Sequence, residues 1–68
     1  MTKREIEILH ILGELYDYWK NHPELRLGQI IVNFTPPHHD DPFYMPDSHY
    51  RAAIQAQLAH ENKEVKDV

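Results

Sequence analysis

The sequence predicts an all-α domain with three helices, over residues 3–20, 23–34 and 47–61. Three observations support this prediction. Apolar residues recur at helical spacing in all three segments, a capping signal opens the first, and prolines crowd the connection between the second and the third. A chain of 68 residues has the length of one small domain, which we place at 1–61. The mostly charged stretch 62–68 is expected to be frayed or disordered.

The first helix opens on Thr2 and Glu5, which match the T-x-x-E pattern of a capping box. Its apolar side chains span an arc of about 180°, which is wider than one neighbouring helix covers. The two flanks of this arc are Ile11 with Tyr18 and Leu9 with Tyr16. We therefore predict a homodimer through Ile11, Leu15 and Tyr18, unless aromatic side chains of the long loop cover the flank in a monomer.

The second element admits two readings. As a helix from Pro23, its apolar residues follow the i, i+3, i+4, i+7 spacing of a buried face: Leu27, Ile30, Ile31 and Phe34. The β-branched residues also suit a strand, but a strand would carry apolar side chains on both faces, which so short a chain can hardly cover. We predict the helix, and the short break before Pro23 predicts an αα-hairpin with the first helix.

Residues 35–46 hold four of the five prolines and are predicted to form a long loop packed across this hairpin. Phe43 and Tyr44 are its expected anchors. Arg26, Gln29 and Asn33 lie at i, i+3, i+7 and form a polar strip along the second helix. This strip either ties down the loop or binds a partner. We expect Arg26 to pair with Asp41 or Asp47; Asp47 is also the expected N-cap of the last helix.

Composition narrows the function. The formal net charge of −4 disfavours a general nucleic-acid binder, and the chain has no cysteine for a disulfide or a thiolate metal site. No nucleophile motif, phosphate-binding glycine loop or isolated carboxylate pair indicates an enzyme or a cofactor. The run HHDD offers His38, His39 and Asp41 as metal ligands, although adjacent side chains diverge. We find neither a signal peptide nor an apolar run of membrane-spanning length, so a cytoplasmic protein without membrane contact is expected.

One longer pattern resembles a known group of proteins. The combination W-x3-P-x2-R-x-G-Q-I-I-x-N, followed by D-P-F-Y-x2-D, is similar to short uncharacterised proteins of bacteria and their phages. The likeness covers residues 19–47. The resemblance implies no activity, but a phage-borne gene favours a binding role directed at the host.

These observations favour a small, non-enzymatic protein-binding or regulatory module. One alternative is a helix-turn-helix-like protein associated with nucleic acid, with Arg26, Gln29 and Asn33 as readers of base edges. The other is a small metal-binding protein that uses the HHDD run.

Overall fold

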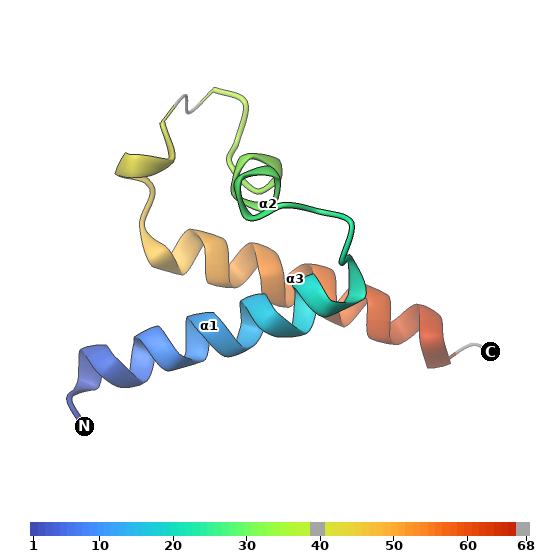
Figure 1. The fold of residues 1–68 in the computed structure, drawn as a ribbon, viewed down its shortest axis with the longest axis horizontal. Helices are drawn as coiled ribbons and strands as arrows, with labels where there is room; N and C mark the ends of the chain where they lie inside the picture. The colour runs from blue at the N-terminus through green and yellow to red at the C-terminus, as the bar shows by residue number, and fades with distance from the viewer. Residues whose placement is uncertain (39–40, 67–68) are drawn as a thin grey trace.

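A computed structural model describes residues 1–38 and 41–66, with side chains as far as residue 62. The described chain forms three α-helices and one 3-10 turn and contains no strand, so the predicted all-α fold class is confirmed (Figure 1). These elements are α1 (Lys3–Asn21), α2 (Leu27–Asn33), η1 (Pro42–Tyr44) and α3 (Asp47–Lys66). The helix predicted for residues 23–34, rather than a strand, is confirmed over Leu27–Asn33.

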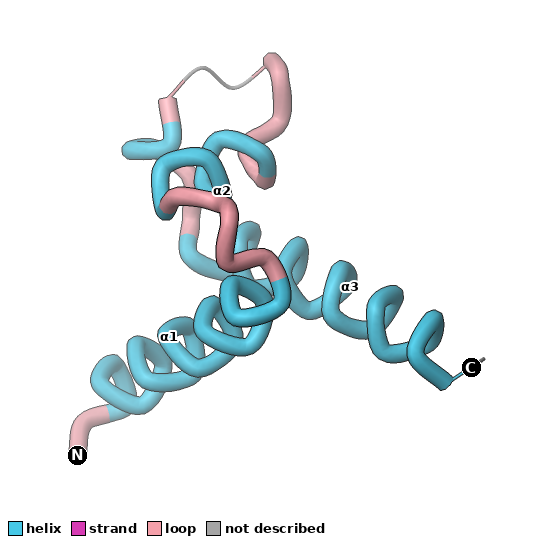
Figure 2. Tube along the Cα trace, turned by 45° about the vertical axis from the view of Figure 1, so that its right-hand side comes forward, coloured by secondary structure: helices cyan, strands magenta, loops and turns pink. Residues whose placement is uncertain are grey.

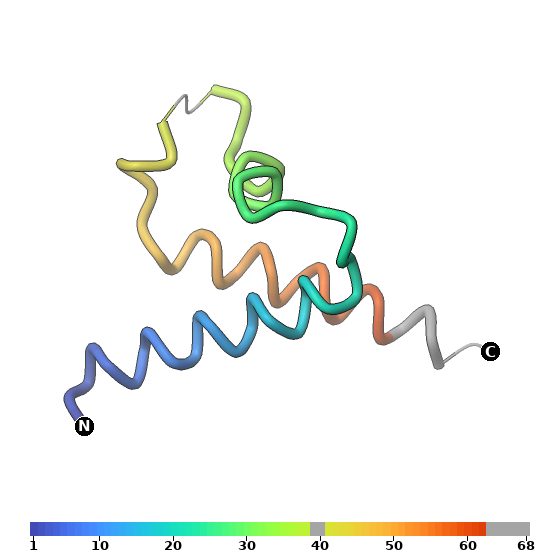
Figure 3. The backbone as a smooth tube through the Cα atoms, in the orientation of Figure 1, coloured from blue at the N-terminus to red at the C-terminus, as the bar shows by residue number. Residues whose placement is uncertain are grey.

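The two long helices, α1 and α3, form the frame of the molecule and make the most extensive helix–helix contact. Both run in the same direction (Figures 1 and 3). Three side-chain contacts follow each other in the same order along both helices: Arg4 with Asp47 at 2.7 Å, Glu14 with Arg51 at 2.9 Å and His22 with Glu61 at 2.6 Å. Figure 2 shows that the helices cross at an angle, so their outer ends diverge.

The short helix α2 lies across the long pair and is seen end-on in Figure 1. The expected αα-hairpin, in which the first two helices are the direct neighbours, therefore needs a correction. The long neighbour of α1 is α3, and α2 crosses over them as part of the connection. A helix of seven residues is only about 10 Å long, too short to pair along the length of α1.

Hydrogen bonds in the connection explain why α2 begins at Leu27 and not at Pro23. The Trp19 indole Nε1 donates to the carbonyl of Leu25 over 2.7 Å, and the Leu25 amide donates to the carbonyl of His22. The Leu25 carbonyl therefore faces the indole instead of the next helical turn. The Gln29 side chain then accepts from the Arg26 amide at 2.8 Å, which satisfies a free donor at the new helix start.

The core is small and sits where the three helices meet. Its buried side chains are one from each helix: Tyr18 at 7% exposure, Ile30 at 0% and Ile54 at 4%. Partly buried apolar side chains surround them: Leu15, Trp19, Leu25, Phe34 and Leu58. Phe34 meets the ring of Tyr18 edge-on at 5.3 Å. The shortest dimension of the molecule is 19 Å, about two helix diameters, so no deeper interior can form.

The first residues of the two long helices are close to the prediction, whereas the last residue of α3 is not. The capping box of Thr2 and Glu5 is confirmed, with both reciprocal hydrogen bonds at 2.8 and 3.1 Å. Asp47, expected as an N-cap, is the first residue of α3, and α3 continues to Lys66 rather than ending near residue 61. The frayed tail predicted for 62–68 lies partly outside the described residues, at 67–68, and stays a prediction. No helix in the described part of the chain combines the length and apolar content of a membrane span.

Ile30→Ala should lower the free energy of unfolding by about 2–5 kcal/mol, because it leaves a cavity at the centre of a core that has only three buried side chains among the described residues. Urea denaturation followed by circular dichroism measures this loss. Val32→Ala is the matched control, since Val32 lies in the same helix but is exposed, and it should change stability by less than about 1 kcal/mol. Equal losses in the two variants would contradict the core described above.

Candidate binding surfaces

Two adjacent aromatic side chains project from the loop between α2 and α3. Phe43 is 83% exposed and Tyr44 is 79% exposed, and their rings contact each other edge to face at 5.0 Å. We call this pair the aromatic knob. It lies on η1, which stands beyond α3 on the side away from α1 (Figure 1). A large apolar pair held in water is the feature of this loop that most needs an explanation.

The backbone under the aromatic knob is fixed by local hydrogen bonds. The Asp41 carboxylate accepts from the Phe43 amide at 2.9 Å, and the Tyr44 amide donates to the Asp41 carbonyl at 3.2 Å. Pro42 begins the turn with a restricted φ, and its carbonyl accepts from the amide of Met45. The knob is therefore presented by an ordered turn.

The prediction that this loop packs across the helices through Phe43 and Tyr44 is wrong. The other end of the loop is instead anchored through polar contacts on α3. Thr35 and Tyr50 share a hydrogen bond of 2.7 Å between their hydroxyls, and His49 Nε2 lies 2.7 Å from the Phe34 carbonyl. These contacts bring the start of α3 against the end of α2, so the described residues between them, 36–38 and 41–46, loop outward.

The polar strip of Arg26, Gln29 and Asn33 is exposed along the outer side of α2. Together with Gly28 and Val32 these residues line a shallow, open hollow of about 600 Å³. The sequence spacing thus predicted correctly that the three polar side chains lie together. Arg26 itself precedes the helix, at its N-cap position.

The predicted tether from Arg26 to the loop is wrong. Asp47 pairs with Arg4 at 2.7 Å, and Asp41 caps the amide of Phe43. Among the described residues no carboxylate forms an ion pair with the Arg26 guanidinium. Of the two readings of the polar strip, the structure removes the one in which Arg26 ties down the loop.

A third surface lies on α1. Four apolar side chains, Ile8, Leu9, Leu12 and Tyr16, are between 41% and 65% exposed. Their spacing places them within about 100° of arc on the helix. We call this row the α1 stripe. It faces away from the core, and no part of the described chain buries it.

The dimer contact predicted through Ile11, Leu15 and Tyr18 is wrong in its residues. Tyr18 is buried, and Leu15 packs against the core, because α3 and α2 together cover that flank of α1. The opposite flank, with Leu9 and Tyr16, remains exposed. The predicted dimer contact would have left the flank with Ile11 and Tyr18 open for a second chain. In the structure that flank is covered, and the flank with Leu9 and Tyr16 is the exposed one.

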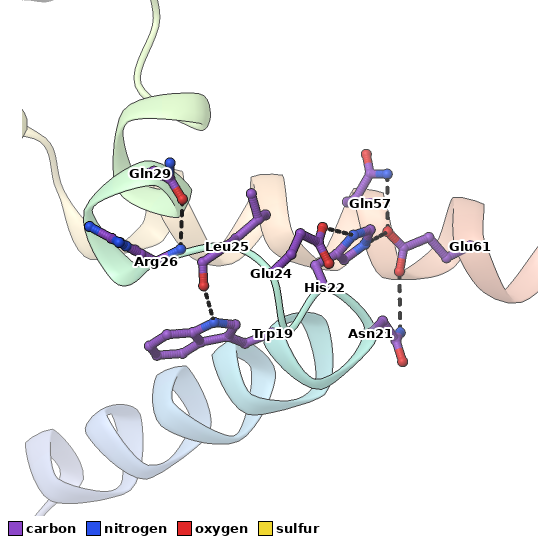
Figure 4. A network of polar contacts seen from close by, with 9 residues as sticks. All are labelled: Trp19, Asn21, His22, Glu24, Leu25, Arg26, Gln29, Gln57 and Glu61. Carbon is purple, nitrogen blue, oxygen red and sulfur yellow. Dashed lines mark hydrogen bonds and ion pairs between the residues drawn. The ribbon is translucent and has the colours of Figure 1, made fainter.

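Polar contacts link α1 and α3 on both sides of the core, and Figure 4 shows the network at the end of α1. Glu61 receives side-chain hydrogen bonds from Asn21 and Gln57, and its Oε2 lies 2.6 Å from His22 Nε2. Partial burial works against ionisation of Glu61, but the contacts with His22, Gln57 and Asn21 outweigh it and lower its pKa. The His22 ring also stacks on Tyr18 at 4.6 Å. This network holds the helices in register.

A second network lies midway along α1. Arg51 donates to both oxygens of Glu14 at 2.9 Å, and Gln55 donates to one of them at 2.7 Å. The hydrogen bonds from Arg51 lower the pKa of Glu14. A bidentate arginine–carboxylate pair of this kind adds orientation as well as energy. Neither network was expected from the sequence, in which the signal for them was the presence of Glu14 and Glu61 beside apolar positions of their helices.

The candidate metal ligands do not assemble into a site in the described chain. Asp41 serves as the cap of η1, and His39 lies outside the described residues. Among the side chains that the structure describes, in residues 1–38 and 41–62, no group of three or more histidine or acidic side chains is placed to hold a metal ion.

Comparisons with protein families, characterised proteins and solved structures found no match for this chain. Any function proposed for this chain therefore rests on the exposed surfaces described above.

Stability should fall as the pH drops below about 4.5, the ordinary carboxyl value, because the folded-state pKa of Glu14 lies below it. A lowered folded pKa adds stability that is fully present above the unfolded value and is lost as the pH falls through the folded one. Urea unfolding at neutral and acidic pH measures this loss. Glu14→Gln should reduce it, whereas the exposed control Glu24→Gln should retain it. The same acid loss in wild type and Glu14→Gln would contradict the assignment.

Proposed function

We propose that the protein is a small non-enzymatic protein-binding module that recognises its partner through the aromatic knob. The observation that supports this proposal is the exposure of Phe43 and Tyr44, at 83% and 79%. Burial of one such side chain contributes about 1.5–3 kcal/mol, and this chain leaves both in water. Aromatic side chains are also the residues that most often dominate the energetics of protein interfaces.

The ordered turn under the knob supports binding rather than passive exposure. A flexible loop loses conformational freedom when it binds, and this loss subtracts from affinity. Here Asp41 and Pro42 already fix the backbone, so the aromatic pair is presented in advance of binding. The fitting partner surface is an apolar pocket large enough for two rings.

The charge around the knob indicates the chemistry of the pocket rim. Residues 35–50 contain three acidic residues and no lysine or arginine. A partner with a basic rim complements this charge and would associate faster at low ionic strength. The exposed polar strip on α2, with its Arg26 guanidinium, offers a second contact for the same or another partner.

The resemblance to short bacterial and phage proteins supports a host-directed partner within this proposal. The nucleic-acid alternative rests on Arg26, Gln29 and Asn33 alone, and salt-dependent binding to duplex DNA is the measurement that tests it. The metal alternative gains no support from the described residues.

We also propose that the protein forms a homodimer through the α1 stripe. A core with one buried side chain from each helix leaves little stability to spare in a chain of 68 residues. Removing Leu9, Leu12 and Tyr16 from water would add apolar burial that the monomer lacks. A two-fold dimer is the commonest closed assembly that does so.

The Phe43→Ala/Tyr44→Ala double variant should lose the partner while keeping the fold. For any protein that the wild type captures, we expect the dissociation constant of the double variant to be at least about 30-fold larger. The reason is that loss of a hot-spot side chain costs about 2 kcal/mol or more of binding free energy. Quantitative capture from bacterial lysate, followed by titration of the captured protein, measures this change. The free energy of unfolding should stay within about 0.5 kcal/mol of wild type, since both rings are exposed.

Leu27→Ala is the matched control, because Leu27 is an exposed apolar residue on α2 that belongs to neither the aromatic knob nor the α1 stripe. It should bind the same partner with unchanged affinity. Capture of the same proteins by the double variant at wild-type strength would rule out the knob as the recognition element.

Sedimentation equilibrium should show the homodimer as a mass rising with concentration from 8.1 kDa towards twice that value. Leu12→Glu should weaken the dimer at least about tenfold, because it places a charge in the apolar contact. Val32→Glu is the control at a similarly exposed apolar position on α2, and it should leave the dimer intact. A mass of one chain at every concentration excludes the dimer.

A further inference from the structure

The α1 stripe is bordered by opposite charges at its two ends. Glu5 lies one helical turn before Leu9, and together with Met1, Ile8 and Leu9 it lines a shallow hollow at the N-terminal end of the stripe. At the other end the Lys20 ammonium lies 5.4 Å from the centre of the Tyr16 ring. Both charged residues therefore belong to the same side of α1 as the stripe.

This charge pattern is self-complementary in only one orientation. A second copy laid antiparallel on the stripe brings Glu5 of each chain towards Lys20 of the other. A parallel copy would place Glu5 beside Glu5 and Lys20 beside Lys20, which is repulsive on an apolar surface. The ion pair that Lys20 already makes with Asp17 is exposed, so it contributes about 1 kcal/mol at most and leaves the ammonium able to exchange partners.

The border of the stripe, midway along α1, supplies a second, independent observation. Gly13 follows Leu12 at the edge of the stripe, and a Cβ atom built there would meet nothing within 4 Å. A glycine inside a helix costs about 1 kcal/mol relative to alanine, and no contact within the described chain requires one at this position. In the antiparallel arrangement that pairs Glu5 with Lys20, Leu12 of one chain faces Gly13 of the other, where the missing side chain leaves room.

We infer that two copies of the chain associate through antiparallel packing of α1 on α1, with the two-fold axis passing between Leu12 and Gly13. Leu9 of each chain then faces Tyr16 of the other, and the pairs of Glu5 with Lys20 close both ends of the contact. The inference rests on the proposed homodimer and specifies its surface and orientation. Since η1 stands away from α1, such a dimer carries two aromatic knobs and can engage a repeated partner with avidity (Figure 1).

Disulfide trapping tests the orientation, because the chain contains no cysteine of its own. Chains with Leu9→Cys are mixed with chains that carry Tyr16→Cys and an affinity tag, under mild oxidation. The mixed disulfide should be the main product, and Tyr16→Cys alone should remain unlinked because its two copies lie about 10 Å apart along the helix axes. Rapid self-linking of Tyr16→Cys would show a parallel contact and overturn the inference, while the homodimer itself would stand.

Gly13→Gln tests the packing at the two-fold axis with a variant that favours the helix. At concentrations where the wild type and the variant are both monomeric, it should raise or preserve the melting temperature of the chain, because glutamine is the better helix former. It should also weaken the dimer at least about tenfold in sedimentation equilibrium, because the new side chain occupies the space of Leu12 from the second copy. Gly28→Gln is the matched control, since Gly28 also has open space beside it but lies on α2. Equal dimerisation of the two glycine variants overturns the inference, and a monomeric wild type overturns it together with the homodimer.

Discussion

The structure depends on the burial of Ile30 between the two long helices. Ile30 is the only side chain of α2 in the core, and it meets Tyr18 of α1 and Ile54 of α3 there. Because α2 has two turns at most, this single side chain fixes where the connection crosses the frame. The position of α2 in turn fixes the loop that follows it, and so the direction in which η1 and the aromatic knob project.

So small a core cannot hold α1 and α3 in register by apolar packing alone. Polar contacts supply the rest, through the bidentate pair of Glu14 with Arg51 and the network around Glu61. Both are partly shielded from water, where hydrogen bonds to charged groups contribute more than they do on an open surface. They also explain why the two helices run in the same direction, since each contact matches positions in the same order along both.

The same limit on core size explains the exposed surfaces. The three buried side chains and the partly buried ones packed against them use one flank of α1, one residue of α2 and one face of α3. The remaining apolar side chains of the described chain stay exposed unless a partner covers them. In the described part of the chain, adjacent exposed apolar side chains collect on the α1 stripe and on the aromatic knob. They lie on different sides of the frame, so the proposed self-association and the proposed partner binding would not compete for one surface.

The sequence by itself determined the helices, because local signals decide them. The helical spacing of apolar residues predicted all three helical segments. The capping box of Thr2 and Glu5 predicted where the first helix begins, and the proline-rich stretch predicted the loop. The spacing of Arg26, Gln29 and Asn33 also determined that they lie together. Only the tertiary structure decided which flank of α1 is covered, that α2 lies across the frame, and that Phe43 and Tyr44 face water. These outcomes depend on contacts between residues far apart in the sequence, such as His22 with Glu61 and Glu14 with Arg51, which no local pattern encodes.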